Sequence, residues 1–213
     1  MNKRKSIIYS IIIVLILLVV VIYTSYAFFA ATVSNGGEQV TGSTNDLSFS
    51  VNATVIHKAT KLIPVSESAV NTAVNKVSNN CIDTENKDVC SMYEVSVQNT
   101  GTNISLYGFV RTNTSTYITN NLKFKVYTRS NNTYTAITDA TSVSNNSGDS
   151  VYFKVNNVNY TTNLTTNQTQ TYYVVFWINE INDSQNDDQD KDYSCKFGFE
   201  GTDGAQLSVL FSV

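Results

Sequence analysis

The residues best suited to chemistry are one histidine and a short acidic run. His57 is the only histidine in the chain. It lies outside any HExxH pattern, so no second histidine joins it around a catalytic metal. The stretch from Ser147 to Ser150 is typical of a turn and lacks the strand-to-helix context of a nucleophilic serine. We therefore predict that the chain is not an enzyme, and we interpret His57 as a surface residue at a strand end.

The acidic run reads DSQNDDQDKD and ends at Asp192. Three of its aspartates stand at every second position, a spacing that oxygen ligands of Ca²⁺ can have: Asp188, Asp190 and Asp192. The EF-hand pattern fails, because Tyr193 stands where that loop needs glycine and Phe199 where it needs a bidentate glutamate. A solvated hairpin loop explains the same residues and is the interpretation we favour, with the three aspartates as the alternative metal site. We predict no other cofactor.

Three cysteines are the remaining reactive residues. Cys81 and Cys90 bracket a small polar loop, and their proximity in sequence makes them the pair most easily joined. Such a disulfide would stabilise the fold by about 2 to 3 kcal/mol. Cys195 is then a buried thiol, an intermolecular link, or the true partner of one of the others, and spacing does not choose among these. Because the chain has no CxxC pair, we do not expect these cysteines to bind metal.

The N-terminus predicts export. Three positive charges precede an apolar run at residues 7–23, so the charges stay in the cytoplasm and everything after Tyr23 crosses the membrane. As a helix this run spans about 25 Å, against about 30 Å of hydrocarbon. Ser25 and Ala27 are the small residues that signal peptidase reads, which places the cut between Ala27 and Phe28. Residues 1–27 are thus either a cleaved signal peptide or a retained membrane anchor.

The composition of the exported part favours an all-β protein. Only 15% of the residues are charged and the net charge is −3. Removing the three N-terminal cations makes the exported part more negative still, which argues against nucleic acid or anionic lipid as its main partner. Thr, Tyr and Val are abundant and favour strands, whereas Asn and Ser favour turns. Sparse charge also leaves strand edges able to pair with other chains.

Short alternating runs predict about nine strands between residues 45 and 213. The first runs from Asp46 to His57 and alternates apolar Leu47, Phe49 and Val51 with polar residues. The others are expected at residues 92–98, 104–110, 122–127, 134–137, 151–155, 171–178, 193–199 and 207–213. Such spacing is typical of a two-sheet β-sandwich of jelly-roll type. Residues 28–44 then form a linker or a donor strand ahead of this domain.

Two segments depart from simple alternation. The run Thr171–Ile178 is apolar on both faces, which predicts a strand in the middle of a sheet that is packed on two sides, with Trp177 in the core. After Pro64, Ser66 is placed to cap one short inserted helix. Its apolar residues fall on one side: Val70, Ala73, Val74 and Val77. The predicted domain therefore contains one helix among its strands.

Three stretches, in order, resemble the TasA/camelysin family of exported Gram-positive surface and biofilm-matrix proteins. The stretch from Thr24 to Ser48 is similar to the family's "TYAYF … SGTLDLS" junction. Residues 62–64 and 93–101 resemble its "NLKPG" turn and the strand with "NTGT" that follows, although Val65 replaces the glycine and residues 66–90 are inserted. Residues 172–180, 182–185 and 196–202 resemble its closing strands, with Asp203 in place of the final glutamine.

The resemblance implies a function through contact. Family members are jelly-roll sandwiches cut by a dedicated signal peptidase after the alanine, here Ala27. Fibre-forming members lend the segment after the cut to the next subunit as an added strand. The implied donor residues here are Phe28, Phe29, Ala31 and Val33. Self-association or pairing with related matrix subunits would follow, at the surface of a Gram-positive-type bacterium or outside it.

The sequence leaves two alternatives open. The chain can be an adhesin or binding module that stays tethered to the membrane through residues 7–23. The other alternative is a camelysin-like metalloprotease, for which the sequence supplies neither three metal ligands nor a base. The mass of the native N-terminus separates the fibre subunit from the tethered module, and metal analysis of the purified domain tests the protease.

Overall fold

The computed structural model describes residues 40–42, 49–76, 80–181, 185, 190–202 and 204–213. Across these ranges, no helix is long and apolar enough to span a membrane. Several sequence predictions fall outside them: the membrane segment at 7–23, the cleavage site Ala27/Phe28, the donor strand, Val77 and Asp188. These remain predictions.

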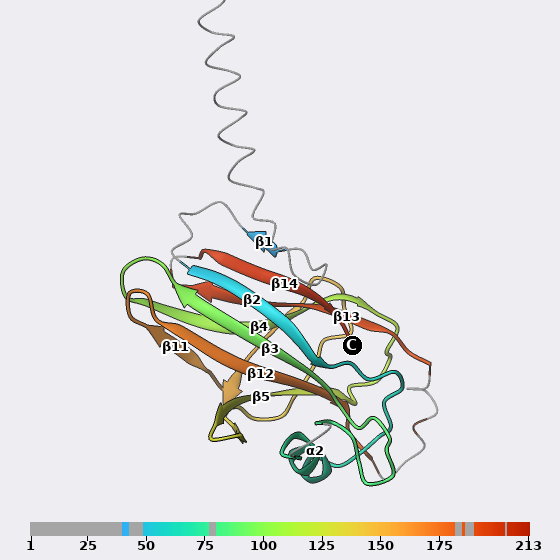
Figure 1. Ribbon diagram of the computed structural model, residues 1–213. Coiled ribbons are helices and arrows are strands. Elements are labelled where there is room, and N and C mark those ends of the chain that lie inside the picture. Colours follow the sequence, from blue (N-terminus) through green and yellow to red (C-terminus); the bar gives the residue numbers. More distant parts are fainter. Residues whose placement is uncertain (1–39, 43–48, 77–79, 182–184, 186–189, 203) are drawn as a thin grey trace, which may run out of the picture. The chain divides into compact units, whose positions relative to one another are not determined.

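Two antiparallel sheets make up most of the described chain (Figure 1). The first, the β13 sheet, has this order: β1 (Val40–Gly42), β14 (Gln206–Ser212), β13 (Tyr193–Gly201), β4 (Ile104–Ser115) and β11 (Thr161–Leu164), with β8 (Ser150–Tyr152) beside β4. The second, the β12 sheet, has this order: β2 (Phe49–His57), β3 (Ser91–Asn99), β12 (Thr169–Ile178), β5 (Leu122–Ser130) and β6 (Thr133–Ala136), with β7 (Thr141–Ser142) beside β5. The predicted all-β, sandwich-like fold is confirmed.

The main core lies between the two sheets. Alternate residues of each strand point to opposite faces, so Tyr172, Val174, Phe176 and Ile178 of β12 all join one buried cluster. Phe197 and Phe199 of β13 meet them from the other sheet. The rings of Phe176 and Phe197 have centroids 5.4 Å apart. This cluster is what makes the two sheets one domain.

The remaining residues of β12 point the other way, into a second core. Tyr173, Val175 and Trp177 pack there with Val70 and Val74 of helix α2 (Glu67–Val74). Trp177 is fully buried. The prediction that this strand is packed on two sides, with Trp177 in the core, is therefore confirmed.

Helix α2 begins and docks as its residues dictate. Ser66 is the N-cap, and its hydroxyl accepts a hydrogen bond of 3.3 Å from the Ala69 N–H. Just before it, the Val65 N–H donates to the carbonyl of Ile178, at 3.0 Å, which seats the helix at the end of β12. Glu67 forms an ion pair with Lys125 of β5. The predicted capped helix is thus confirmed over its described residues.

One predicted strand divides in two, and the alternation in the sequence did not predict the short strands β1, β7, β10 (Val158–Asn159) and β11. Residues 151–155 form two strands: β8 pairs with β4, while β9 (Lys154–Val155) pairs with β10. They separate at Phe153, whose ring enters the main core and whose N–H donates to the carbonyl of Gly108 at 2.9 Å. Strand β11 was missed because Leu164 is its only strongly apolar residue.

Asparagine turns connect several of these strands. Asn156 and Asn157 both have positive φ, 51° and 63°, and join β9 to β10. Asn131 and Asn132, at 48° and 63°, join β5 to β6 in the same way. Successive positive φ values are what a tight hairpin turn with the correct twist requires, and asparagine adopts them more easily than most residues. The abundance of asparagine is therefore partly explained by hairpins.

Candidate functional site

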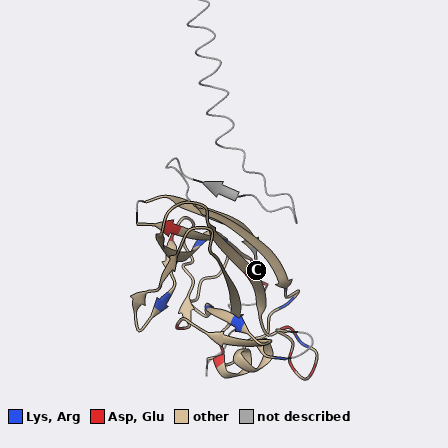
Figure 2. Cartoon of the chain, turned by 60° about the vertical axis from the view of Figure 1, so that its left-hand side comes forward, with Lys and Arg blue, Asp and Glu red and all other residues tan. Residues whose placement is uncertain are grey.

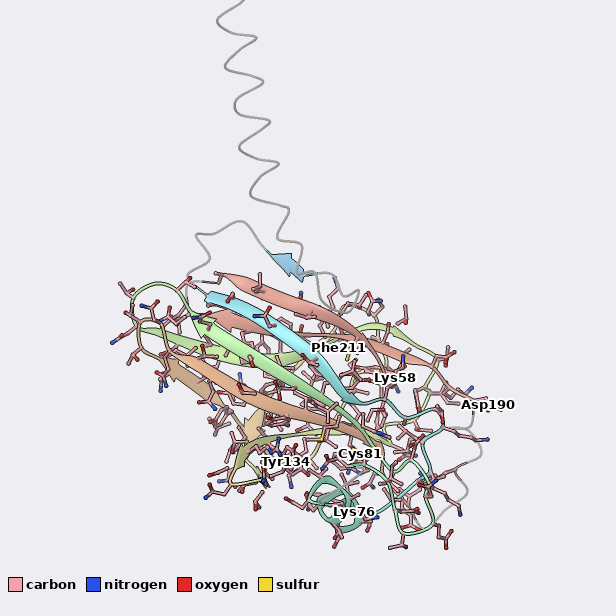
Figure 3. The ribbon with its side chains drawn as sticks, viewed as in Figure 1. Lys58, Lys76, Cys81, Tyr134, Asp190 and Phe211 are labelled. Atoms are coloured by element: carbon pink, nitrogen blue, oxygen red, sulfur yellow. A yellow bond between two sulfur atoms is a disulfide. The ribbon has the colours of Figure 1, made fainter. Side chains whose placement is uncertain are left out.

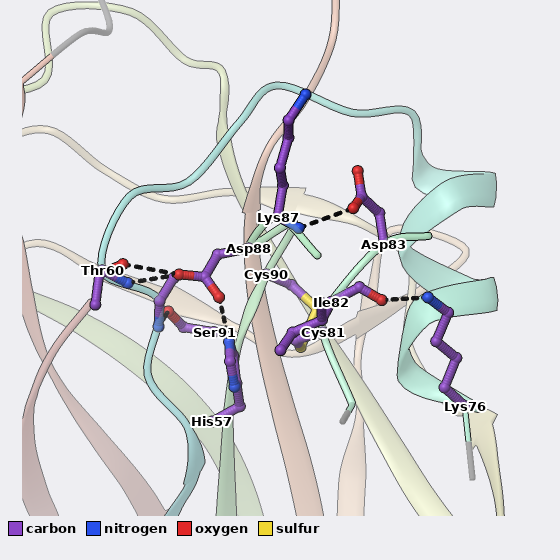
Figure 4. A network of polar contacts seen from close by, with 11 residues as sticks. His57, Thr60, Lys76, Cys81, Ile82, Asp83, Lys87, Asp88, Cys90 and Ser91 are labelled. Carbon is purple, nitrogen blue, oxygen red and sulfur yellow. Dashed lines mark hydrogen bonds and ion pairs between the residues drawn. A yellow bond between two sulfur atoms is a disulfide. The ribbon is translucent and has the colours of Figure 1, made fainter. Parts of the chain in front are cut away.

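A network of polar contacts joins the end of β2 to the loop between the two bonded cysteines (Figure 4). His57 Nε2 lies 2.9 Å from Asp88 Oδ1. The other oxygen of Asp88 accepts hydrogen bonds from the Thr60 N–H at 2.8 Å and the Thr60 hydroxyl at 3.1 Å. Only 20% of the His57 side chain and 18% of the Asp88 side chain are exposed. His57 does end β2, as predicted, but its side chain is largely covered and bonded to Asp88, which lies 31 positions away in sequence.

The Asp88 carboxylate is held in its charged form. Burial raises the pKa of Asp88, but the hydrogen bonds from Thr60 and His57 together lower it further, so the pKa lies below the ordinary value of 3.8. A carboxylate of this kind is a poor general acid near neutral pH. Within the described residues, His57 has no hydrogen bond to a serine, threonine or cysteine side chain. The arrangement suits a structural latch better than a nucleophile and its base.

The predicted disulfide is present. Cys81 and Cys90 are joined with an S–S distance of 2.07 Å, and both are fully buried in the second core beneath α2. Cys195 lies in β13 and belongs to the core between the two sheets. Cys195 is buried there and is not the partner of Cys81 or Cys90, which are bonded to each other.

A cleft of about 480 Å³ lies near the acidic loop, where the segment after β2 faces the start of β13. Its apolar lining includes Leu62, Tyr117, Ile178 and Val213. Its polar lining includes Lys61 and Lys191 together with Asp190 and Asp192, and Figure 3 shows Asp190 on the loop at this end of the molecule. Two positive and two negative side chains balance, so the lining suits a small neutral molecule that offers both an apolar face and hydrogen-bonding groups.

The calcium candidates are only partly described. Asp190 and Asp192 are both exposed at the cleft, and Asp188 lies outside the described residues. The backbone of Asp192 is tied to Thr116, because the Asp192 N–H donates to the Thr116 hydroxyl at 2.7 Å. Among described residues, no three His, Cys, Asp or Glu side chains lie together as metal ligands would. The complete set of three aspartates remains a prediction.

Strand β2 presents a surface that the sequence did not reveal. It is the longest edge strand in the described chain, with nine residues, against two to four in β1, β6, β7, β8 and β11. Its outer side pairs with no described strand.

The side chains of β2 leave this edge without the usual protection. The strand contains no Lys, Arg, Asp or Glu, and Figure 2 shows how few strand positions carry charge at all. Val55 is 44% exposed and Ile56 is 40% exposed. The one feature of β2 that discourages pairing is a bulge between Val55 and His57. The sequence predicted this strand but not its place at the edge.

Comparisons with known proteins add no family assignment. The resemblance to TasA/camelysin sequences therefore remains a prediction. No protein-family model matches the chain, and no curated protein matches it significantly.

Proposed function

We propose that this chain is a non-enzymatic, exported structural protein of a bacterial cell surface or extracellular matrix, and that it assembles by accepting an added strand at β2. The observation that carries the proposal is the long, uncharged and unpaired edge of that strand. A row of unpaired backbone N–H and C=O groups is best satisfied by another extended chain. The jelly-roll connectivity of the TasA/camelysin family is part of the same proposal.

The surroundings of β2 favour one added strand. Strand β14 contacts β2 across the sandwich, and β1 lies outside β14 in the other sheet. At the edge where β2 lies, the β13 sheet therefore extends one strand further than the β12 sheet. A strand added to β2 would complete the shorter sheet and cover Val55, which is now exposed.

The donor that suits this edge is the segment after the predicted cleavage site. Phe29, Ala31 and Val33 fall on one face of an extended strand, and no residue from 28 to 33 is charged. Such a segment can reach a neighbouring subunit only after the cut between Ala27 and Phe28 separates it from the membrane helix. Strand donation therefore links export, cleavage and assembly in one sequence of events.

Replacing Val55 with lysine is expected to block assembly without unfolding the subunit. A lysine on an open edge discourages strand addition by placing a solvated charge beside the incoming chain. We expect the concentration needed for polymer formation to rise by about tenfold or more, which corresponds to about 1.4 kcal/mol per added strand. Sedimentation and electron microscopy would measure the polymer, and circular dichroism would check the monomer fold.

Ile118 provides the matched control, because it is 71% exposed but lies outside every described strand. The Ile118→Lys variant adds the same charge and should assemble like the natural chain. Equal loss of polymer in both variants would point to net charge instead of the β2 edge. Unchanged assembly of the Val55→Lys variant would show that strands are not added there.

The cleft favours a second candidate function, that of a membrane-tethered binding module or adhesin. Its volume of about 480 Å³ falls within the usual range of about 300 to 1,000 Å³ for small-molecule sites. Its balanced lining suits a neutral polar ligand. In this case the N-terminal helix would have to be retained as the anchor.

The mass of the chain isolated from its native cell decides between the two candidates. The structural subunit is expected to begin at Phe28, because strand donation needs a released N-terminus. An intact N-terminus beginning at Met1 or Asn2 would favour the tethered binding module. A chain with an intact N-terminus would still contain β2. The Val55→Lys assay therefore tests strand addition at β2, whereas the mass of the N-terminus tests cleavage.

A further inference from the structure

The outer face of the β13 sheet carries charged side chains at its centre. Cys195, Phe197 and Phe199 of β13 belong to the core between the sheets. Because successive side chains of a strand point to opposite faces, Lys196 and Glu200 lie on the outer face, where both are partly exposed. Only 15% of the chain is charged, so charge at the middle of a sheet face is unusual for this protein.

Two positive side chains stand side by side on this face. Arg111 of β4 and Lys196 of β13 are direct cross-strand partners, and the Cβ atoms of such partners lie about 4.5 to 5.5 Å apart. Like charges in this position repel each other. Within the described part of the chain, neither side chain forms an ion pair with a carboxylate. An anion bound at the two side chains would remove this repulsion.

The guanidinium of Arg111 is held in a fixed orientation. Its Nε donates to the Ser150 hydroxyl at 2.7 Å, and its Nη2 donates to Gln206 Oε1 at 3.1 Å. The guanidinium carbon lies 5.0 Å from the ring centroid of Phe109. Nη1 donates to no described residue. A guanidinium positioned in this way can bind a carboxylate through its remaining N–H groups with little further loss of freedom.

A glycine provides the space for this arrangement. The Phe109 ring lies against Gly198 of β13, since a Cβ atom added to Gly198 would be 2.4 Å from a carbon of that ring. Phe109 is only 1% exposed, although it belongs to neither core cluster. Glycine weakens the interior of a strand and often marks a close approach. Here it lets Phe109 lie flat on the sheet and support the Arg111 guanidinium.

Hydrogen-bond acceptors and aromatic rings lie beside the positive pair. Glu200 is the cross-strand partner of Gln206 on one side and of Tyr107 on the other. Its Oε2 accepts a hydrogen bond of 2.6 Å from the Tyr152 hydroxyl. A carboxylate near the Arg111 guanidinium repels a simple inorganic anion but accepts hydrogen bonds from hydroxyl groups. Both tyrosines are partly exposed and offer apolar ring surface with a polar end.

We propose that this surface, defined by Tyr107, Arg111, Tyr152, Lys196 and Glu200, binds acidic sugar units of a polysaccharide. The two cations bind the sugar carboxylate, Glu200 accepts hydrogen bonds from sugar hydroxyls, and the tyrosine rings contact the apolar face of the sugar ring. A ligand of this class combines the negative charge, the hydroxyl groups and the apolar face that the surface complements. The inference goes beyond assembly at β2, because β2 belongs to the other sheet.

Isothermal titration calorimetry of the full chain with a galacturonate oligomer would test the surface. The Arg111→Gln variant should bind about 10-fold to 100-fold more weakly, because it loses charge-assisted hydrogen bonds. The Lys196→Gln variant should bind about threefold to fivefold more weakly, as expected for an exposed ion pair. Lys196 is partly exposed and outside both cores, so this variant should fold even if Arg111→Gln does not.

The methyl ester of the same oligomer is the matched ligand, because it keeps the rings and the ring hydroxyls but removes the charge. It should bind the natural chain about tenfold more weakly or not at all. Inorganic polyphosphate of equal charge has no hydroxyl-bearing ring and should also bind more weakly. Equal binding of the methyl ester would overturn the role of charge, and equal binding of polyphosphate would overturn the preference for sugar.

Arg129→Gln is the matched protein control. Arg129 lies in β5 of the other sheet, with its guanidinium carbon 5.1 Å from the ring centroid of Tyr134. It resembles Arg111 in charge and in ring contact, and its loss should leave binding unchanged. Equal weakening by Arg129→Gln and Arg111→Gln, or natural binding by both Arg111→Gln and Lys196→Gln, would overturn the site. The Val55→Lys variant should bind the oligomer like the natural chain, which separates this test from assembly at β2.

Discussion

Replacing Phe176 with alanine is expected to lower the free energy of unfolding by about 3 to 5 kcal/mol. The Phe176 side chain is fully buried between the sheets. Its ring lies 6.1 Å from Tyr93, 6.0 Å from Phe124 and 5.4 Å from Phe197, centroid to centroid. Alanine would remove contacts to both sheets and leave a cavity where they meet. Since small domains are stable by only about 5 to 15 kcal/mol, this change alone would bring the fold close to unfolding.

Denaturant unfolding followed by circular dichroism would measure the effect. Phe176→Leu is the matched control, because leucine keeps most of the volume and should cost less than about half as much. A loss below about 1 kcal/mol in Phe176→Ala would contradict a continuous core between the sheets. It would suggest that the two sheets unfold as separate units.

Replacing Gly108 with alanine is expected to lower the free energy of unfolding by about 3 kcal/mol, at the upper end of the usual range for overpacking. A Cβ atom at this position would lie 2.2 Å and 2.3 Å from two ring carbons of Phe153. The Phe153 ring cannot easily move, since it is buried against Phe124 and Phe199 with ring centroids 6.0 Å and 6.3 Å away. The added methyl group must therefore displace either the ring or the strand.

A double variant tests whether Phe153 is the cause. The loss of unfolding free energy in the Gly108→Ala, Phe153→Leu double variant should be about 1 to 2 kcal/mol smaller than the sum of the losses in the two single variants, as expected for two groups in contact. Gly148 is a useful comparison, because it has φ of 89° and a Cβ atom added there would meet nothing within 4 Å. Gly148→Ala should cost only about 1 kcal/mol from backbone strain. Additive effects at Gly108 and Phe153 would contradict the proposed clash.

These expectations describe a domain with a well-packed centre and one unprotected edge. The main core joins the sheets through aromatic contacts, and the second core joins the β12 sheet to helix α2. By contrast, β2 has one paired side and one open side among the described strands. A rigid sandwich with an accessible backbone edge suits a protein that works by contact, because the edge can accept a strand without rearranging the core.

The sequence alone determined the features that depend on neighbours along the chain. Alternation predicted most of the strands, and the two-sided apolar run predicted that β12 is packed on both faces. Ser66 predicted the start of α2. Cys81 and Cys90 are separated by nine positions, so the small loop between them made their bond the most accessible choice. In each case the physical cause is local, either side-chain direction along a strand or helix, or the ease of closing a short loop.

Only the tertiary structure decided which distant segments meet. It placed β2 at an edge, brought Asp88 to His57 across 31 positions, and set Phe153 against Gly108 so that a predicted strand divides in two. Period-two alternation shows that a strand has a buried face, but it does not identify the strand that lies beside it. That choice depends on how the apolar faces of the whole chain fit together at once, and no single stretch of residues contains this information.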